Sequence, residues 1–273
     1  MCPLSDTFTG VSHDGGLALV RKSVEVLDLL AARGEATAAQ LAEDLGEPRS
    51  SVYRLLSSLQ HLDMVESGSR RGTFRLGFHL LSLGTAVVDR FDERRFAQPV
   101  MERLHDETGE TVYLCVRRGR DAVCIERLDG RRVQSLALKL GGALPLHAGA
   151  ASRALLAFQD RSTWSDYLQQ GPLEQFTPTT PVTADALFPV LEETLSSGIS
   201  VSDQDVTLGV AALGVPILDY RGQVRAALSV SGVREAILGA EASGLRERLV
   251  EAGQEVSRAL GWKAVTGAVA DFG

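Results

Sequence analysis

Residues 37–62 constrain the fold more strongly than any other stretch, because their sequence, TAAQLAEDLGEPRSSVYRLLSSLQHL, predicts two short helices separated by a tight break. Thr37 and Gln40 have the spacing of a capping box at the start of the first helix. Gly46 tolerates the left-handed conformation that often follows a helix end, and Pro48 suits the first position of the next helix. The stretch therefore predicts a helix-turn-helix.

The second of these helices, residues 48–62, has an apolar face and a polar face. Its apolar side chains recur at helical spacing and predict a buried face: Val52, Leu55, Leu56, Leu59 and Leu62. The other face carries hydroxyls, a tyrosine and two arginines, with no acidic side chain among them: Arg49, Ser50, Ser51, Tyr53, Arg54, Ser57 and Ser58. Because such side chains contact phosphates and base edges, we predict that the first five of these residues bind DNA.

The flanking sequence extends this motif to residues 17–76. An apolar stripe predicts a preceding helix over residues 17–33, packed beneath the pair: Leu19, Val20, Val24, Leu27 and Leu30. Residues 63–66 and 73–76 predict a β-hairpin around a turn rich in Gly, Ser and Arg. Arg70 and Arg71 lie at its tip, where they would reach phosphates or the minor groove. We therefore predict a winged helix-turn-helix.

The distribution of charge agrees with a local DNA-binding surface. The chain of 273 residues has a net charge of −7, but residues 48–76 contain five arginines against two carboxylates. Residues 91–273 instead carry 19 basic and 24 acidic side chains. The acidity thus lies mainly away from the predicted DNA-binding face, and local charge is what matters for DNA binding.

The composition also excludes several classes of protein. No apolar run approaches the roughly 20 residues that span a bilayer. Residues 1–16 lack the basic start and apolar stretch of a signal peptide and predict a disordered tail, as do residues 263–273. Three cysteines are too few for a disulfide scaffold, so we expect a reduced, cytoplasmic location.

Residues 77–95 predict a linker helix whose apolar content is high for a solvated connection. It contains Leu80, Leu81, Leu83, Val87, Val88 and Phe91. One interpretation is that it packs on its own domain. We favour dimerisation, because a DNA-binding protein gains affinity and half-site spacing by pairing two modules.

Residues 96–262 predict an α+β domain, a mixed sheet with helices outside it. The expected helices cover residues 99–108, 148–159, 163–169, 183–197 and 238–260. The expected strands cover residues 112–116, 123–127, 133–140, 199–201, 212–218 and 224–233. If Arg117 pairs with Ala122 in the first hairpin, Cys115 faces Cys124; the pair is then either a redox switch or two inert buried thiols, which we favour.

Several segments resemble, in order and spacing, the IclR family of bacterial transcriptional regulators, and the resemblance covers residues 17–262. In the N-terminal part they are RSSVYRLLSSLQ, Met64–Glu66 and Phe74–Gly77. In the C-terminal part they are LPLHAGAASRALLAF, GISVSDQDVTLGVAALGVPILDYRGQVRAALSVSG and VSRALGW. The resemblance implies a winged-helix reader, a linker helix in dimer contacts and a GAF-like effector domain. It also implies a homodimer or homotetramer on a palindromic operator, with a small organic effector, often a carboxylate or aromatic acid.

The same resemblance implies which residues line the effector pocket. Ala150 and Ala151 match the small residues after the PLHA run, and Ser229 and Ser231 match the paired serines of the ALSVSG strand. Further matched positions are Leu136, Leu144, Ser202, Asp203, Val210 and Ala212. Ser202 stands where relatives often have an acid, and Ala212 where they often have a cysteine, which suggests a smaller or more neutral set of polar contacts.

Local chemistry agrees in part with this pocket. Ser229 and Ser231 are two apart on a predicted strand, so they share one face. If that face is inward, their hydroxyls bond a ligand, an ordered water or the neighbouring backbone. His147 precedes a predicted helix, where it either meets an anionic ligand group or, as we favour, bonds the backbone as a structural histidine.

Two other classes of function are weaker interpretations. The five histidines show no metal-ligand spacing, and residues 228–232 lack the first glycine of a nucleophile elbow, so we expect neither an enzyme nor a cofactor. A winged helix that binds protein rather than DNA is the second alternative, and the arginines of the recognition face argue against it. The sequence thus predicts a ligand-responsive, DNA-binding transcriptional regulator.

Overall fold

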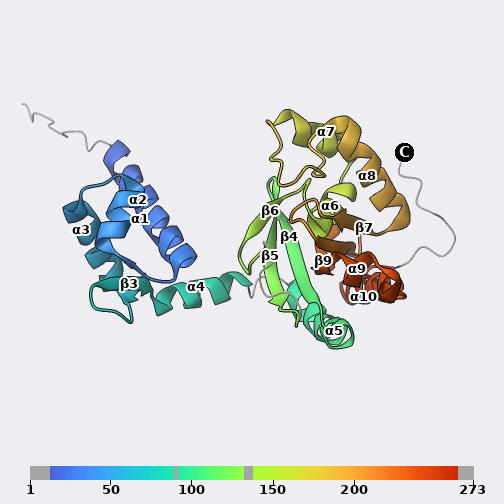
Figure 1. Cartoon of the computed structure of the whole chain (residues 1–273), viewed down its shortest axis with the longest axis horizontal. Coiled ribbons are helices and arrows are strands. Elements are labelled where there is room, and N and C mark those ends of the chain that lie inside the picture. The colour runs from blue at the N-terminus through green and yellow to red at the C-terminus, as the bar shows by residue number, and fades with distance from the viewer. Residues whose placement is uncertain (1–12, 89–91, 132–137, 264–273) are drawn as a thin grey trace, which may run out of the picture. The chain divides into compact units, whose positions relative to one another are not determined.

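The computed structural model describes residues 13–88, 92–131 and 138–263, and the chain divides into two compact units between Arg90 and Phe91 (Figure 1). Leu136 and most of the strand expected over residues 133–140 therefore lie outside the described residues, as do both chain ends.

The N-terminal unit is a winged helix-turn-helix, as predicted. Its elements are α1 (His13–Arg33), β1 (Ala36–Thr37), α2 (Ala38–Leu45), α3 (Arg49–His61), β2 (Val65–Ser67), β3 (Thr73–Leu76) and α4 (Phe78–Val88). The capping box is present: the Thr37 N–H donates to Gln40 Oε1 at 2.9 Å, and the Gln40 N–H donates to Thr37 Oγ1 at 3.3 Å. Gly46 ends α2 with a left-handed φ of 63°. The local sequence thus determines the turn.

The core of this unit confirms the buried face of α3 but not that of α1. Val52, Leu55, Leu56 and Leu59 are buried, whereas Leu62 follows the helix and is exposed. In α1, Val26 and Leu30 are buried, but Leu19, Val20 and Val24 are more than half exposed. The predicted stripe was wrong at its N-terminal end, because only the C-terminal half of α1 packs against the pair. The helix also starts at His13, within the segment predicted as a tail.

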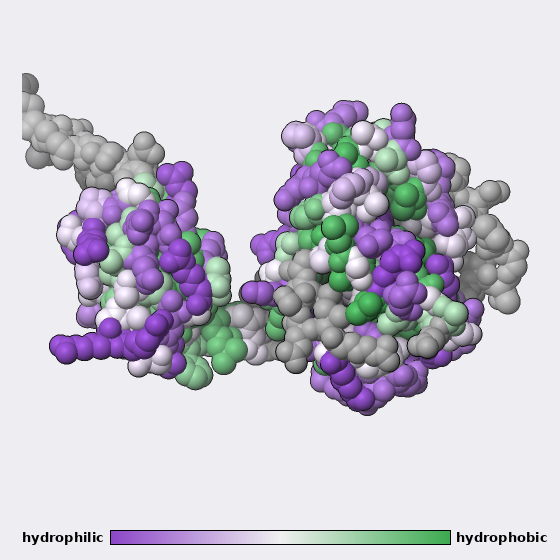
Figure 2. All heavy atoms as spheres, viewed as in Figure 1, coloured by the Kyte–Doolittle hydropathy of each residue, from purple (hydrophilic) through white to green (hydrophobic). Residues whose placement is uncertain are grey.

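The segment predicted as a linker helix, residues 77–95, contains parts of two described helices, and residues 89–91 between them lie outside the described residues. The first, α4, ends at Val88, and α5 (Asp92–Thr108) starts well before the predicted Pro99. Asp92 and Glu93 in the first turn of α5 suit the positive end of the helix dipole. Apolar side chains on α4 are exposed within the described residues, namely Phe78, Leu81 and Leu83, and Figure 2 shows apolar surface on this helix.

The C-terminal unit is an α+β domain around one sheet. After α5 its elements are β4 (Thr111–Arg118), β5 (Asp121–Leu128), β6 (Ala143–Pro145), α6 (Ala150–Ala157), α7 (Arg161–Gln169), α8 (Ala184–Ser197), β7 (Ser200–Asp203), β8 (Val210–Leu218), β9 (Val224–Val233), α9 (Arg234–Leu238), a short 3₁₀ helix (Ala240–Ala242) and α10 (Leu245–Ala259). Among the described residues the strand order is β6-β5-β4-β9-β8-β7. Neighbouring strands are antiparallel throughout, so the expectation of a mixed sheet was wrong.

The C-terminal helix and the first hairpin of this unit can also be compared with the sequence-based expectations. The single helix predicted over residues 238–260 is broken, because Gly239 and Gly244 separate α9, the 3₁₀ helix and α10. The predicted register of the first hairpin is confirmed: Arg117 pairs with Ala122, and Cys115 pairs with Cys124. Both thiols are buried and free.

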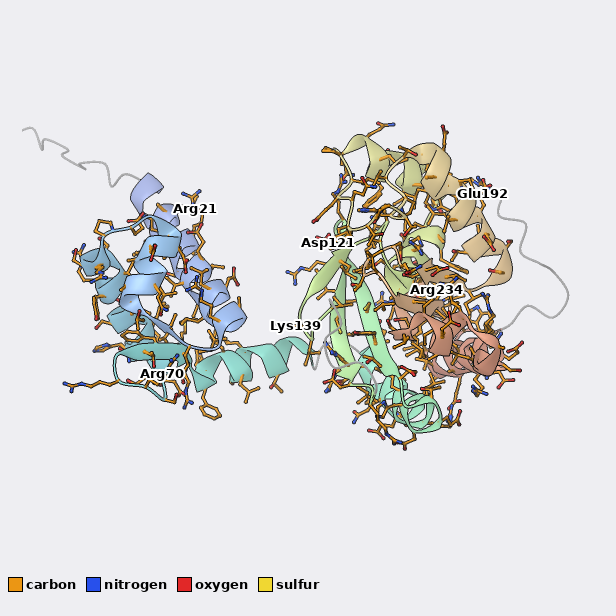
Figure 3. All side chains as sticks on the ribbon, in the orientation of Figure 1. Arg21, Arg70, Asp121, Lys139, Glu192 and Arg234 are labelled. Carbon is orange, nitrogen blue, oxygen red and sulfur yellow. The ribbon has the colours of Figure 1, made fainter. Side chains whose placement is uncertain are left out.

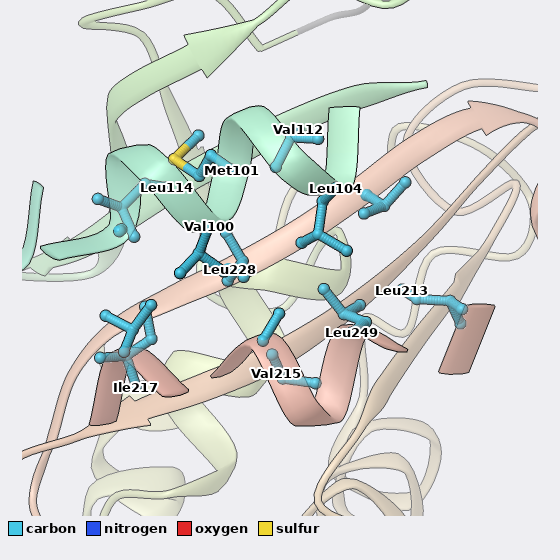
Figure 4. Packing of buried hydrophobic residues seen from close by; sticks show 14 of the residues in the cluster. Val100, Met101, Leu104, Val112, Leu114, Leu213, Val215, Ile217, Leu228 and Leu249 are labelled. Carbon is cyan, nitrogen blue, oxygen red and sulfur yellow. The ribbon is translucent and has the colours of Figure 1, made fainter. Parts of the chain in front are cut away.

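Each face of the sheet is covered by its own set of helices (Figure 1). On one face, α5 and α10 enclose an apolar core with alternate residues of β4, β8 and β9, such as Leu114, Leu213 and Leu228 (Figure 4). On the other face, α6, α7 and α8 pack over the intervening residues, such as Tyr113 and Ala227. The second face carries the serines of β9, because side chains alternate along a strand.

Within the described ranges, no helix combines the length and the apolar character that crossing a membrane requires.

Candidate DNA interface and effector pocket

The exposed face of α3 carries the side chains predicted to bind DNA. Arg49, Ser50, Tyr53 and Arg54 are exposed, and Ser51 is half-buried. Neither arginine forms an ion pair within the described part of the chain. The Tyr53 ring packs edge-on against Phe74 of β3 at a centroid distance of 6.3 Å, which fixes α3 against the wing. The face thus presents uncompensated positive charge on a rigid helix.

The wing is fixed to the body of the unit by Glu35. The Glu35 carboxylate accepts from the Ser69 N–H at 2.7 Å and from Thr73 Oγ1 at 3.1 Å. The backbone hydrogen bond from Ser69 is the main cause that lowers the pKa of Glu35. Arg70 (Figure 3) and Arg71 are exposed in this turn, with Arg70 Nε 4.0 Å from Glu35 Oε2. The turn therefore holds two predicted DNA-binding arginines at a defined place.

A pocket opens in the C-terminal unit between the sheet, the N-terminus of α6 and the loop from β7 to β8. The space between its atoms, with the adjoining open solvent included, is about 520 Å³. Its lining residues are uncharged: Tyr113, Leu138, Leu144, Gly149, Ala150, Ala151, Ser152, Ser202, Val206, Thr207, Val210, Ala211, Ala212, Ser229 and Ser231.

Most of the predicted effector-binding residues line this one pocket. They are Leu144, Ala150, Ala151, Ser202, Val210, Ala212, Ser229 and Ser231. The strand register explains why they meet, since Ser202 pairs with Ala212 and Ala212 pairs with Ser231 in one row across three strands. The two serines differ: Ser231 Oγ donates to the Ala211 carbonyl at 3.1 Å, whereas the Ser229 hydroxyl has no hydrogen-bond partner among the described residues.

The N-terminus of α6 approaches the sheet unusually closely. Gly214 of β8 allows this approach, because a Cβ there would lie 2.7 Å from the backbone of Ala150. Gly149 precedes α6 with a left-handed φ of 86°. The first N–H groups of a helix have no partner inside the helix and favour negative charge. Here they belong to Ala150 and Ala151 in the pocket wall, which makes this wall suited to an anion.

A buried ion pair holds that wall to the neighbouring loop. Arg153 Nη1 donates to Asp205 Oδ2, and both residues are almost fully buried. Asp205 also accepts from the Gly149 N–H at 3.2 Å and from the Ser202 hydroxyl. Arg153 further donates to the Val201 carbonyl at 2.5 Å. The pair thus joins α6, β7 and the β7–β8 loop around the pocket.

His147 does not line the pocket. Its Nε2 lies 2.8 Å from the Glu174 carbonyl, which only accepts, so Nε2 carries the proton. Nδ1 of the neutral ring then accepts from the Tyr167 hydroxyl at 2.9 Å. Burial is the main cause that lowers the pKa of His147. The structural interpretation of this histidine therefore fits better than contact with a ligand.

Asp203 also lies outside the pocket lining. Its carboxylate forms a two-pronged ion pair with Arg234, with Nε–Oδ1 at 2.7 Å and Nη2–Oδ2 at 2.9 Å. The hydrogen bond from Arg234 is the main cause that lowers the pKa of Asp203. Because alternate residues of β7 face opposite sides of the sheet, Ser202 reaches the pocket and Asp203 does not.

Sequence reasoning missed several pocket residues. Among them are Tyr113, Ser152, Val206 and Thr207, together with the Arg153–Asp205 pair behind the wall. The alternation of β4 contained a usable signal, because Val112 and Leu114 on one face leave Tyr113 on the other. The described residues contain no cluster of His, Cys, Asp or Glu able to hold a metal ion.

Comparisons with protein families match both units. A model of the IclR helix-turn-helix domain matches residues 19–68, and a model of the bacterial transcriptional regulator IclR C-terminal domain matches residues 85–258. The HTH-type transcriptional regulator KipR of Bacillus subtilis is 31% identical over 243 residues, 89% of this chain and 97% of KipR. The HTH-type transcriptional repressor AllR of Escherichia coli is 32% identical over 255 residues, 93% and 94% of the two chains.

Solved structures agree with these matches. Thermotoga maritima IclR superposes with a TM-score of 0.77 at 27% identity, covering 90% of this chain and 100% of its own. An IclR homolog from Microbacterium hydrocarbonoxydans, solved in complex with 4-hydroxybenzoate, superposes with a TM-score of 0.77 at 26% identity. The match covers 89% of this chain and 99% of the homolog.

The lowered pKa of His147 predicts a loss of stability in acid. The unfolded chain binds a proton at this histidine near pH 6.5, whereas the folded protein binds it only at lower pH. Between these two pKa values the unfolded state holds more protons, so the free energy of unfolding falls as the pH decreases.

We therefore expect the wild type to lose more stability than His147→Gln between pH 7.5 and pH 5.5. Urea unfolding followed by tryptophan fluorescence measures both proteins at both pH values, and groups that titrate in both cancel in the comparison. Equal losses in the two proteins would show that His147 is not the responsible group.

Proposed function

The chain belongs to the IclR family of bacterial transcriptional regulators, and we propose that its α3 face reads an operator while its C-terminal pocket senses a small organic acid. As a member of this family it is a ligand-responsive, DNA-binding regulator and not an enzyme. It represses or activates genes near its operator. We place it in the cytoplasm, where bacterial DNA lies.

The exposed, uncompensated arginines of α3 support the assignment of the DNA-contacting residues. Arg49 and Arg54, with Ser50, Ser51 and Tyr53, contact base edges or the adjacent phosphates in the major groove. Arg70 and Arg71 add affinity that depends little on sequence, because a wing arginine pairs with phosphates. The family assignment favours this interpretation over a winged helix that binds protein.

Exposed apolar side chains support a homo-oligomer. Phe78, Leu81 and Leu83 of α4 are exposed, as are several residues in the N-terminal half of α1. Apolar surface of this kind marks interfaces, so we assign these helices to contacts between copies of the chain. A homodimer or homotetramer then presents paired α3 helices to a palindromic operator.

The neutral pocket beside the N-terminus of α6 carries the effector proposal. N–H groups at Ala150 and Ala151 favour an anionic group, and the Asp205 carboxylate is compensated by Arg153. The remaining lining is apolar or hydroxylic, which suits the body of a small carboxylate or aromatic acid. The relative solved with 4-hydroxybenzoate supports this class of ligand.

Loss of one recognition arginine should weaken operator binding without unfolding the protein. A bidentate arginine–guanine contact contributes about 1–3 kcal/mol, so Arg54→Ala should bind a duplex selected from a random pool roughly 5- to 150-fold more weakly. If Arg54 contacts only phosphate, the slope of the logarithm of the binding constant against the logarithm of the salt concentration should instead become about one unit less steep.

Fluorescence anisotropy across a salt series measures both quantities. Arg161→Ala makes the same change of charge in the C-terminal unit, where Arg161 pairs with Glu192, and should bind as the wild type does. Wild-type binding by Arg54→Ala would contradict the assignment of α3.

Filling the pocket should abolish the response to acids. We expect one or more members of a panel of small carboxylates and aromatic acids to raise the melting temperature of the full chain, because a ligand at a hundredfold excess over Kd stabilises by about 2.7 kcal/mol. Ala212→Leu places a larger side chain in the lining and should lose this shift.

Ala184→Leu makes the same substitution at an exposed position of α8 and should keep the shift. An unaltered shift in Ala212→Leu would move the effector site elsewhere. A panel in which no acid stabilises the wild type would contradict the proposed class of effector.

A further inference from the structure

The hydroxyl of Tyr113 distinguishes this pocket from a simple anion site. Tyr113 lies in β4 and is one of the pocket-lining residues, and only 4% of the residue is exposed. Its hydroxyl is enclosed and has no hydrogen-bond partner among the described residues. Buried polar groups are otherwise paired as a rule, so this phenol needs an explanation.

A second buried tyrosine shows that the fold pairs such a hydroxyl where it is structural. Tyr167 is 3% exposed, and its hydroxyl bonds both Nδ1 and the backbone N–H of His147. Phenylalanine at position 113 would fill the same space without leaving a polar atom unpaired. The hydroxyl of Tyr113 is therefore not required by the packing.

Tyr113 is the strand neighbour of Ser229, whose hydroxyl also has no hydrogen-bond partner among the described residues. The strand register pairs Tyr113 with Ser229, and Ser229 with Gly214, in one row across β4, β9 and β8. Burial raises the pKa of the Tyr113 phenol, so at neutral pH it remains a donor. Two pocket-lining residues with unpaired hydroxyls are thus neighbours across β4 and β9.

Tyr113 is two strands away from the strand that meets the anion-binding wall, and Ser229 lies between them. Gly214 lies directly beneath Ala150, and two strand spacings of about 4.8 Å each separate Gly214 from Tyr113. One atom of a ligand cannot contact both places. A ligand with a polar atom at each end, several carbon atoms apart, can do so.

We propose that Tyr113 is a specificity-determining residue, which with Ser229 binds a second oxygen of the effector, a hydroxyl or carbonyl group remote from its carboxylate. The inference rests on the proposed function, because it assumes that the carboxylate lies at the N-terminus of α6. The preferred effectors are then hydroxy- or oxo-substituted acids about as long as a para-substituted benzoate, rather than unsubstituted acids.

The first test needs no ligand. Melting temperatures of the full chain compare Tyr113→Phe with Tyr167→Phe, each of which removes one buried phenol oxygen. We expect Tyr113→Phe to melt at or above the wild-type temperature and Tyr167→Phe to melt below it. A fall for Tyr113→Phe as large as that for Tyr167→Phe would overturn the proposal, since the hydroxyl would then have a partner in the protein.

The second test uses matched acids. Calorimetric titration of the full chain compares benzoate with 4-hydroxybenzoate, and phenylacetate with 4-hydroxyphenylacetate. We expect the wild type to bind the hydroxylated member of at least one pair about tenfold more tightly, because a buried hydroxyl without its partner is costly. Tyr113→Phe should reduce this preference to within about twofold while its affinity for the unsubstituted acid is unchanged.

Two outcomes separate the proposals from each other. Acids that bind the wild type with no preference for a hydroxyl, or a preference that Tyr113→Phe retains, would overturn the role of Tyr113 and leave the acid-binding pocket standing. Failure of all four acids to bind, together with the wider panel of carboxylates, would overturn the proposed effector class and this inference with it.

Discussion

The buried pair of Arg153 and Asp205 is the interaction on which the C-terminal site depends. Taking two charges out of water costs several kcal/mol for each ion, and hydrogen bonds must offset that cost. Here the carboxylate also binds the Gly149 N–H and the Ser202 hydroxyl, while the guanidinium also binds the Val201 carbonyl. Because these partners come from α6, β7 and the β7–β8 loop, the requirement to compensate two charges fixes the walls of the pocket.

The sequence predicted best those features that short-range chemistry determines. The capping box at Thr37, the left-handed Gly46 and the apolar spacing of α3 involve neighbours within a few residues, and each is present. The register that opposes Cys115 and Cys124 followed from the length of one turn. The family resemblance identified eight residues that line the one pocket, although their roles toward an effector are still proposals.

The remaining features depend on contacts between distant segments. Arg153 and Asp205 are 52 positions apart, and no local pattern reveals that they pair. Burial of α1 was predicted for its whole length, but a helical stripe does not state whether it faces its own core or another copy of the chain. Side chains alternate along β7, so only one of Ser202 and Asp203 can face the pocket. The sequence of β7 alone does not show which of the two it is, because that depends on how the strand pairs within the sheet.

A ligand-responsive regulator must couple the binding of an acid in its pocket to the binding of DNA by α3, and the reciprocity of that coupling is directly measurable. The measurement is the Kd of the most stabilising acid for the free protein and for the protein saturated with its selected duplex. Thermodynamic linkage predicts that the two values differ by the same factor by which the acid changes the affinity for the duplex, typically about 5- to 150-fold. Identical affinities for the acid in the two states would contradict the account.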